Sequence, residues 1–131
     1  MRIVLALALA AAEAAAQPAL TPQAFQAISE GRTLHFNYLG QPFGAEQYLS
    51  DRRVLWRFDD GSCQQGRWWE ADELICFAYD NGDTPQCWRF QPSAAGFAAS
   101  LVEDGADTGF VLELAGSNTT PLDCPGPEVG S

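Results

Sequence analysis

Residues 75–90 read ICFAYDNGDTPQCWRF, and this stretch decides the fold. Ile75, Phe77 and Tyr79 occupy every second position, which is typical of a strand with one buried face. Asn81-Gly82 follows, a dipeptide favoured in two-residue hairpin turns. The stretch therefore predicts two antiparallel strands joined by a tight turn.

The same turn predicts a disulfide. A two-residue turn places Cys76 opposite Cys87, with the Cβ atoms near bonding range. Cys63 and Cys124 would form the second bond and tie the C-terminal segment to the central strands. The alternative, Cys63–Cys76 with Cys87–Cys124, would need an earlier turn within a stretch that reads as strand. Pro85 cannot donate a ladder hydrogen bond, so a longer loop with a locally bulged register also stays open.

The rest of the chain repeats the strand pattern. Alternating segments predict strands at residues 33–38, 53–58, 63–69, 75–79, 87–90, 97–102 and 110–114. Turn residues separate these segments, including a turn at residues 40–44, and no connection has room for the crossover helix of a parallel sheet. The predicted fold is mainly β, a single antiparallel meander or small barrel-like sheet of seven or eight strands. The predicted core face holds Phe36, Val54, Trp56, Phe58, Ile75, Phe77, Trp88 and Phe90.

One short helix should precede the sheet. Thr21 is a good N-cap and Gly31 a natural stop. Because two turns of helix are not stable alone in water, we expect Phe25 and Ile28 to dock on the sheet. Residues 116–131 are rich in Pro, Gly, Ser and Thr, and we expect an irregular tail there.

The N-terminal residues are typical of a secretory signal peptide. Met1-Arg2 gives a basic start, residues 3–12 are an apolar run, and Ala14-Ala15-Ala16 offers a small-residue cleavage site. An apolar run of ten residues is too short to span a membrane, which takes about 20. We expect cleavage after Ala16, which leaves a single disulfide-stabilised domain, residues 17–131, in the periplasm or outside the cell.

Composition excludes several classes of function. The 131 residues include 17 acidic, seven basic and one histidine side chain, for a net charge of −10. This charge argues against binding to nucleic acid or to an anionic membrane. A single histidine and the lack of a Gly-x-Ser-x-Gly segment argue against an enzyme, so no catalytic residues are predicted.

No metal site and no cofactor are predicted either. The gaps between consecutive cysteines are 12, 10 and 36 residues, unlike the two-residue spacing common in zinc sites. The Asp-rich turns carry aromatic residues where a calcium loop needs oxygen ligands.

Adjacent tryptophans suggest a binding surface. Trp68 and Trp69 cannot both face inward on a regular strand. Tryptophan and arginine are enriched at interface hot spots, so Trp69 with Arg57, Arg67 and Arg89 forms a candidate binding surface.

Three segments form a Gly-x-Trp…Cys-Phe…Cys-Trp core, Gly66-Arg67-Trp68, Cys76-Phe77 and Cys87-Trp88, and Cys124-Pro125-Gly126-Pro127 follows near the C-terminus. In these segments the chain resembles a family of small secreted or periplasmic proteins of proteobacteria. The resemblance spans nearly the whole chain after the signal peptide. It implies export, an antiparallel β fold and paired cysteines, and it carries over no activity.

The sequence predicts an exported, non-enzymatic binding protein. One form binds a protein as an inhibitor-like domain, with its charge steering it toward a basic envelope or extracellular partner. The alternatives are a small-ligand carrier of the lipocalin-like barrel type and an envelope-directed hydrolase. A cavity lined by aromatic side chains would favour the carrier. A filled core with exposed Trp and Arg would favour the protein binder, and two carboxylates facing each other across a cleft the hydrolase.

Overall fold

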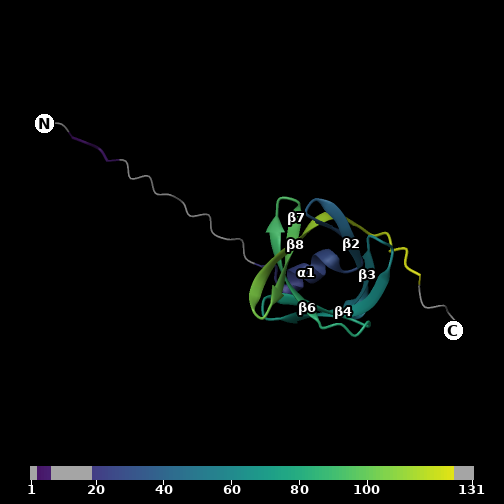
Figure 1. The fold of residues 1–131 in the computed structure, drawn as a ribbon. Coiled ribbons are helices and arrows are strands. Elements are labelled where there is room, and N and C mark those ends of the chain that lie inside the picture. Colours follow the sequence, from purple (N-terminus) through teal and green to yellow (C-terminus); the bar gives the residue numbers. More distant parts are fainter. Residues whose placement is uncertain (1–2, 7–18, 126–131) are drawn as a thin grey trace.

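Eight antiparallel strands close into a barrel in the computed structural model, which describes residues 3–6 and 19–125 (Figure 1). Each strand pairs with its neighbours in sequence, and β8 pairs with β1 to close the barrel. The strands are β1 Thr33–Tyr38, β2 Gln41–Tyr48, β3 Arg53–Phe58, β4 Cys63–Ala71, β5 Leu74–Tyr79, β6 Gln86–Ser93, β7 Gly96–Glu103 and β8 Ala106–Asn118. The mainly β prediction is confirmed in its barrel form. The predicted signal peptide, apart from residues 3–6, lies outside the described residues.

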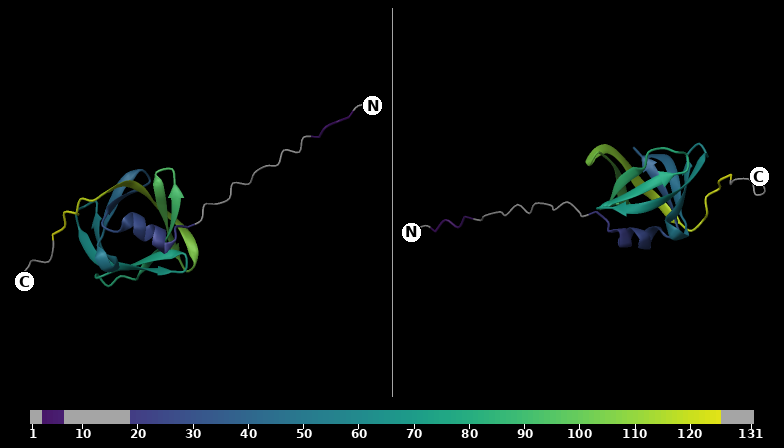
Figure 2. Two further views of the ribbon diagram at one scale, coloured as in Figure 1. Left: turned by 180° about the vertical axis from the view of Figure 1, so that it is seen from behind. Right: turned by 90° about the horizontal axis from the view of Figure 1, so that it is seen from below.

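The helix α1 (Pro22–Ser29) lies across one end of the barrel (Figure 2). The Thr21 hydroxyl caps it by accepting a 3.1 Å hydrogen bond from the Ala24 amide. Phe25 is fully buried, as predicted, but the docking of Ile28 is wrong, because that side chain is 38% exposed. Ser29, one turn after Phe25, is buried instead. The helix has eight residues and buries only Phe25 and Ser29 against the barrel.

Both predicted disulfides are present. Cys76–Cys87 joins β5 to β6 with its Cα atoms 4.0 Å apart, and Cys63–Cys124 ties the C-terminal tail to β4 with 5.9 Å between Cα atoms. The predicted hairpin register is also confirmed for Cys76 and its two neighbours, since Ile75 pairs with Trp88. The ladder then ends at Phe77–Gln86, so the connection is longer than a two-residue turn.

The predicted turn at residues 40–44 is wrong. The chain reverses at Leu39 and Gly40, whose φ angles of 49° and 77° are both left-handed. Such a two-residue turn suits the twist of a hairpin, so the next strand, β2, begins at once at Gln41. This strand is the one that alternation did not reveal.

The predicted irregular tail begins later than expected. β8 continues to Asn118, which pairs with Thr33 on β1 and so helps to close the barrel. Beyond it, the tail lies along the outside of β2 and β3. The Leu122 amide donates to the Gln47 side chain at 3.0 Å, and Arg57 donates to the Asp123 carbonyl at 3.1 Å.

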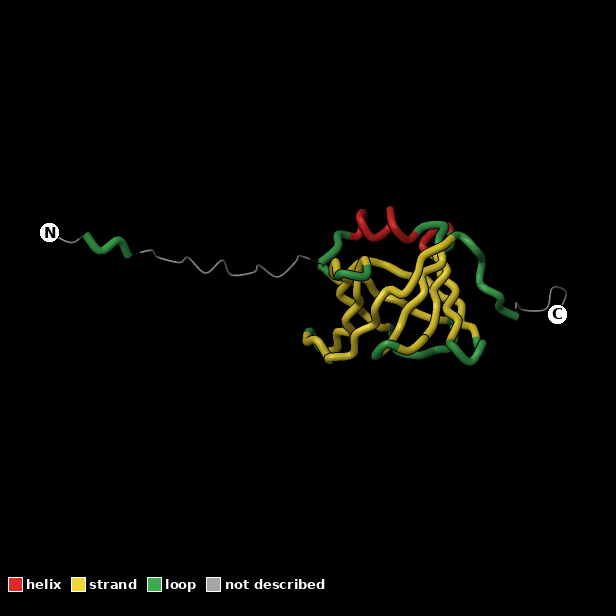
Figure 3. The backbone as a smooth tube through the Cα atoms, turned by 90° about the horizontal axis from the view of Figure 1, so that it is seen from above, coloured by secondary structure: helices red, strands yellow, loops and turns green. Residues whose placement is uncertain are grey.

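The core occupies the barrel interior. The helix α1 covers one end of the barrel, and turns between strands stand at the opposite end (Figure 3). Seven residues of the predicted core face are buried: Phe36, Val54, Trp56, Ile75, Phe77, Trp88 and Phe90. The eighth, Phe58, is only half-buried because it ends β3 near the turns. Trp68 points into the core, which leaves Trp69 on the outside of β4.

Candidate functional site

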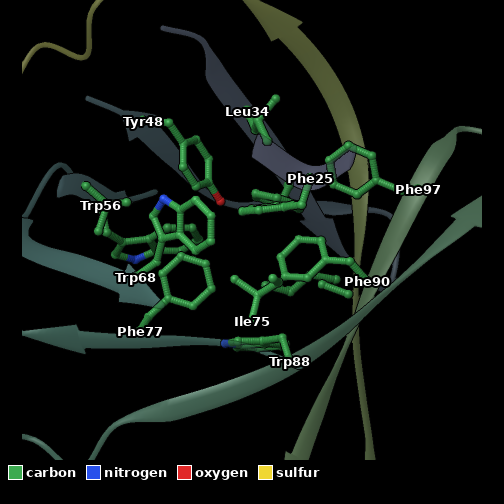
Figure 4. Packing of buried hydrophobic residues seen from close by; sticks show 14 residues of the cluster. Phe25, Leu34, Tyr48, Trp56, Trp68, Ile75, Phe77, Trp88, Phe90 and Phe97 are labelled. Atoms are coloured by element: carbon green, nitrogen blue, oxygen red, sulfur yellow. The ribbon is translucent and has the colours of Figure 1, made fainter. Parts of the chain in front are cut away.

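The barrel interior holds a cavity of about 250 Å³. Aromatic side chains from most strands form its walls, among them Phe36, Trp56, Phe58, Phe77, Tyr79, Trp88 and Phe110. Figure 4 shows how Trp56, Phe77 and Trp88 converge on the interior from β3, β5 and β6. The core is therefore hollow on the side away from the helix.

Phe25 closes the end of the barrel that α1 covers. Its ring meets Tyr48 and Trp68 edge-on, with centroid distances of 5.5 and 5.2 Å, and lies 4.6 Å from the Phe90 ring. These contacts bury the Phe25 side chain completely. Phe25 thus packs behind Tyr48 and Phe90, two residues that line the cavity.

The opposite end of the barrel is the mouth. Asp83 and Thr84, exposed residues of the β5–β6 connection, line the cavity there. The pairing of β5 with β6 ends at Phe77–Gln86, so the residues between these two do not pair with each other at the rim of the barrel. Pro85 explains the early stop, since it has no N–H to extend the ladder. The cavity thus reaches the surface between these two strands.

One carboxyl group, that of Glu46, lies inside the barrel. Its residue is only 2% exposed, and it lines the cavity. The Tyr79 hydroxyl donates to its two oxygens at 2.8 and 3.1 Å. Among the described residues, none that lines the cavity is basic. The carboxyl group therefore has a tyrosine as its partner rather than an ion pair.

Burial changes the acidity of this pair. Loss of hydration raises the pKa of Glu46 to about 8, and the Tyr79 hydrogen bond offsets only part of that shift. The pKa of Tyr79 and that of Tyr48 are also raised, by burial first and then by the nearby Glu46 charge. A pKa of about 8 favours the protonated form of Glu46 at neutral pH.

Gly44 lets the cavity wall form beside Glu46. A Cβ atom at Gly44 would overlap the Trp56 ring and lie 2.8 Å from the Arg57 carbonyl oxygen. The absence of a side chain leaves the indole room to lie against β2. A register shift between Phe36 and Asn37 also sets Phe43 into the cavity wall.

Glu46, Phe43 and Gly44 are not among the predicted site residues, because the glycines and the proline of residues 40–44 predict a turn and no strand is predicted after them. The available signal was the spacing of Glu46 and Tyr48, two positions apart just before a turn. On a strand whose Tyr48 is buried, Glu46 must face the same way.

The predicted binding-surface residues all lie on the outside of the barrel. Arg57, Arg67 and Trp69 come from adjoining strands, β3 and β4, whereas Arg89 lies on β6, two strands from β4. The Arg57 side chain donates a hydrogen bond to the Asp123 carbonyl in the tail, and Arg89 forms an ion pair with Asp107. Their role as a binding surface stays a prediction.

Comparison with known proteins finds no family model, no curated protein and no solved structure that matches this chain. The resemblance to a proteobacterial family therefore stays a prediction. Within the residues that the structure describes, no group of three or more His, Cys, Asp or Glu could hold a metal ion. No helix in that part of the chain is long and apolar enough to cross a membrane.

Proposed function

We propose that this protein is a small-ligand carrier that holds an apolar molecule inside its barrel. The observation that carries the proposal is the aromatic cavity of about 250 Å³ with one buried carboxyl group in its wall. Ligand sites are typically concave and apolar, with a few polar groups that fix orientation. Closed barrels of eight strands have interiors wide enough for one small ligand.

The cavity volume indicates the size of the ligand. A dry apolar cavity of about 150 Å³ is enough to bind benzene. At about 250 Å³, this cavity has room for a molecule larger than a single ring. The opening at Asp83 and Thr84 provides the route of entry.

The carrier is favoured over the inhibitor-like protein binder because the interior is hollow. The alternative depends on Trp69 and three arginines, and two of these, Arg57 and Arg89, already contact other parts of the chain. The hydrolase is disfavoured because the buried carboxyl of Glu46 meets Tyr79 rather than a second carboxyl group. The proposed role is binding without catalysis.

The proposed site of action is the periplasm or the extracellular space. Two disulfides support this placement, because such bonds persist in oxidising compartments and are rare in the cytosol. An exported carrier would hold an apolar molecule away from water between cellular surfaces.

Titration with N-phenyl-1-naphthylamine, an apolar probe that is neutral at pH 7, tests the proposal. Saturable binding at one site should increase probe emission and quench Trp56 and Trp88, which line the cavity. Ala99→Phe should abolish binding, because Ala99 is buried in the cavity wall. Ala98→Phe is the matched control on the same strand, since Ala98 alternates to the outside. Absence of saturable binding to the wild type, or equal binding by both variants, would overturn the proposal.

A further inference from the structure

We propose that the cavity selects a positively charged ligand, an organic ammonium ion joined to an apolar body, with Glu46 as its counter-ion. The inference rests on the proposed carrier function and deepens it by naming the class of ligand. Three features of the site support it: the charges of the lining, its aromatic walls and the hydrogen bonding of Glu46.

The first feature is the sign of the charges in the cavity wall. Glu46 and Asp83 are both acidic, and no described residue of the lining is basic. A buried charge is costly unless an opposite charge pairs with it. An anionic ligand such as a fatty acid would find no opposite charge here and would enter past Asp83. The lining therefore admits neutral or cationic ligands.

The second feature is the aromatic wall around the carboxyl group. Trp56 and Trp88 line the cavity, and Phe77 and Tyr79 lie nearly parallel, with 7° between their planes. The faces of such rings carry negative charge density and attract cations, ammonium ions above all. Aromatic walls hold any apolar ligand, but only a cation gains from both the rings and Glu46.

The third feature is the unused acceptor capacity of Glu46. Both carboxyl oxygens receive their hydrogen bond from the same donor, the Tyr79 hydroxyl. An ionised carboxylate offers roughly four acceptor positions. Glu46 thus keeps the capacity to accept a charge-assisted hydrogen bond, or to neutralise a quaternary ammonium, on its cavity side.

The rim of the barrel has the matching charge. Exposed acids stand in three connections at the mouth: Asp59 and Asp60 between β3 and β4, Asp80 between β5 and β6, and Asp104 between β7 and β8. Negative charge around an opening raises the local concentration of cations and speeds their entry. The rim assists the proposed ligand but does not form its site.

A cation in the cavity would couple binding to a proton. Glu46 faces two titratable groups, Tyr79 from β5 and Tyr48 from its own strand, and Asp83 lines the same cavity at the mouth. Because burial raises the pKa of Glu46 to about 8, Glu46 must lose its proton at pH 7 to pair with a cation. Binding should therefore release about one proton at pH 7, and affinity for a permanent cation should rise between pH 6 and 9.

The test uses three ligands of similar size. Benzyltrimethylammonium is the cation, neopentylbenzene is its neutral isostere, and 3-phenylpropanoate is the anion. Each competes with the naphthylamine probe at pH 8. We expect the cation to bind at least about tenfold more tightly than the isostere, and the anion to bind least. Calorimetry at pH 7 in buffers of different ionisation enthalpy should detect the released proton.

Glu46→Gln should abolish both the preference for the cation and the proton release, while the neutral isostere still binds. Glu113→Gln, the same substitution at an exposed position on β8, should keep both. If the probe binds but the isostere matches or exceeds the cation, or if none of the three competes, the charge inference fails and the carrier proposal stands. If the probe itself does not bind, both fail.

Discussion

The hydroxyl of Tyr79 donates to both carboxyl oxygens of Glu46, at 2.8 and 3.1 Å, inside the barrel. Glu46 comes from β2 and Tyr79 from β5, so the barrel fold alone brings them together. Burial opposes ionisation of the carboxyl group more strongly than this hydrogen bond favours it. The pair is a buried polar group in a cavity lined mainly by aromatic side chains, and it makes the stability of the fold depend on pH.

We expect the free energy of unfolding to fall as pH rises from about 4.5 to about 8, because the pKa of Glu46 rises between these values on folding. In this window the folded protein holds a proton that the unfolded chain has released. Each pH unit then lowers stability by up to about 1.4 kcal/mol. Below the window both states hold the proton and the contribution is complete, whereas above it the contribution is lost. Denaturant titrations at half-unit pH steps measure the slope.

Glu46→Gln isolates this effect, because the amide cannot ionise. The difference in unfolding free energy between wild type and Glu46→Gln should change steadily across the window and level off on either side. Glu113→Gln, on the exposed outside of β8, should follow the wild type. Parallel pH profiles for wild type and Glu46→Gln would contradict the raised pKa.

The buried contacts of Phe25 support a second prediction. Phe25→Ala should lower the free energy of unfolding by about 3–5 kcal/mol, because the lost ring is fully buried against Tyr48, Trp68 and Phe90. It should also weaken probe binding, because Phe25 packs against Tyr48 and Phe90, which line the cavity. Ile28→Ala is the matched control on the same helix, where 38% exposure predicts a loss below about 1 kcal/mol. Equal losses for the two variants would show that α1 does not seal the barrel through Phe25.

Local signals explain why much of the fold could be predicted. A hairpin centred on Asn81-Gly82 predicts that Cys76 faces Cys87, and this register is found although the ladder ends at Phe77–Gln86. The alternation of Val54 and Trp56 likewise depends on one strand and one core face. Both predictions agree with the structure because neither requires knowledge of distant partners.

The cavity and its carboxyl group depend on distant contacts, and the sequence did not predict them. Glu46 lies in a strand whose glycine is explained only by the Trp56 ring packed against it from β3. Read locally, residues 40–44 contain two glycines and a proline, which favour a turn. Whether a barrel is filled or hollow depends on how side chains from all eight strands meet, which no local pattern records.

The close approach at Gly44 makes a third prediction. Gly44→Ala should lower stability by about 1–3 kcal/mol and alter probe binding, because the new Cβ would overlap the Trp56 ring in the cavity wall. Gly116→Ala, on β8, meets nothing within 4 Å and should leave both properties nearly unchanged. Unfolding titrations and the emission of Trp56 distinguish the two variants. A Gly44→Ala protein with wild-type stability and binding would place Trp56 elsewhere.

The last prediction concerns the two disulfides. The bond whose loss should lower stability more is not the bond whose loss should weaken probe binding more. Cys63–Cys124 spans 61 residues and Cys76–Cys87 spans 11. By chain entropy, removing the first should cost about 4 kcal/mol and the second about 3 kcal/mol.

The long bond holds only the tail on the outside, whereas the short one joins β5 to β6, where the ladder ends at Phe77–Gln86 beside the mouth. Paired Cys→Ala variants should therefore show that losing Cys63–Cys124 lowers stability more but spares probe binding. Losing Cys76–Cys87 should weaken probe binding under conditions where both variants are folded, because the rim of the cavity loses its covalent link. Unchanged binding after loss of Cys76–Cys87 would mean that the rim is held by the barrel ladder alone.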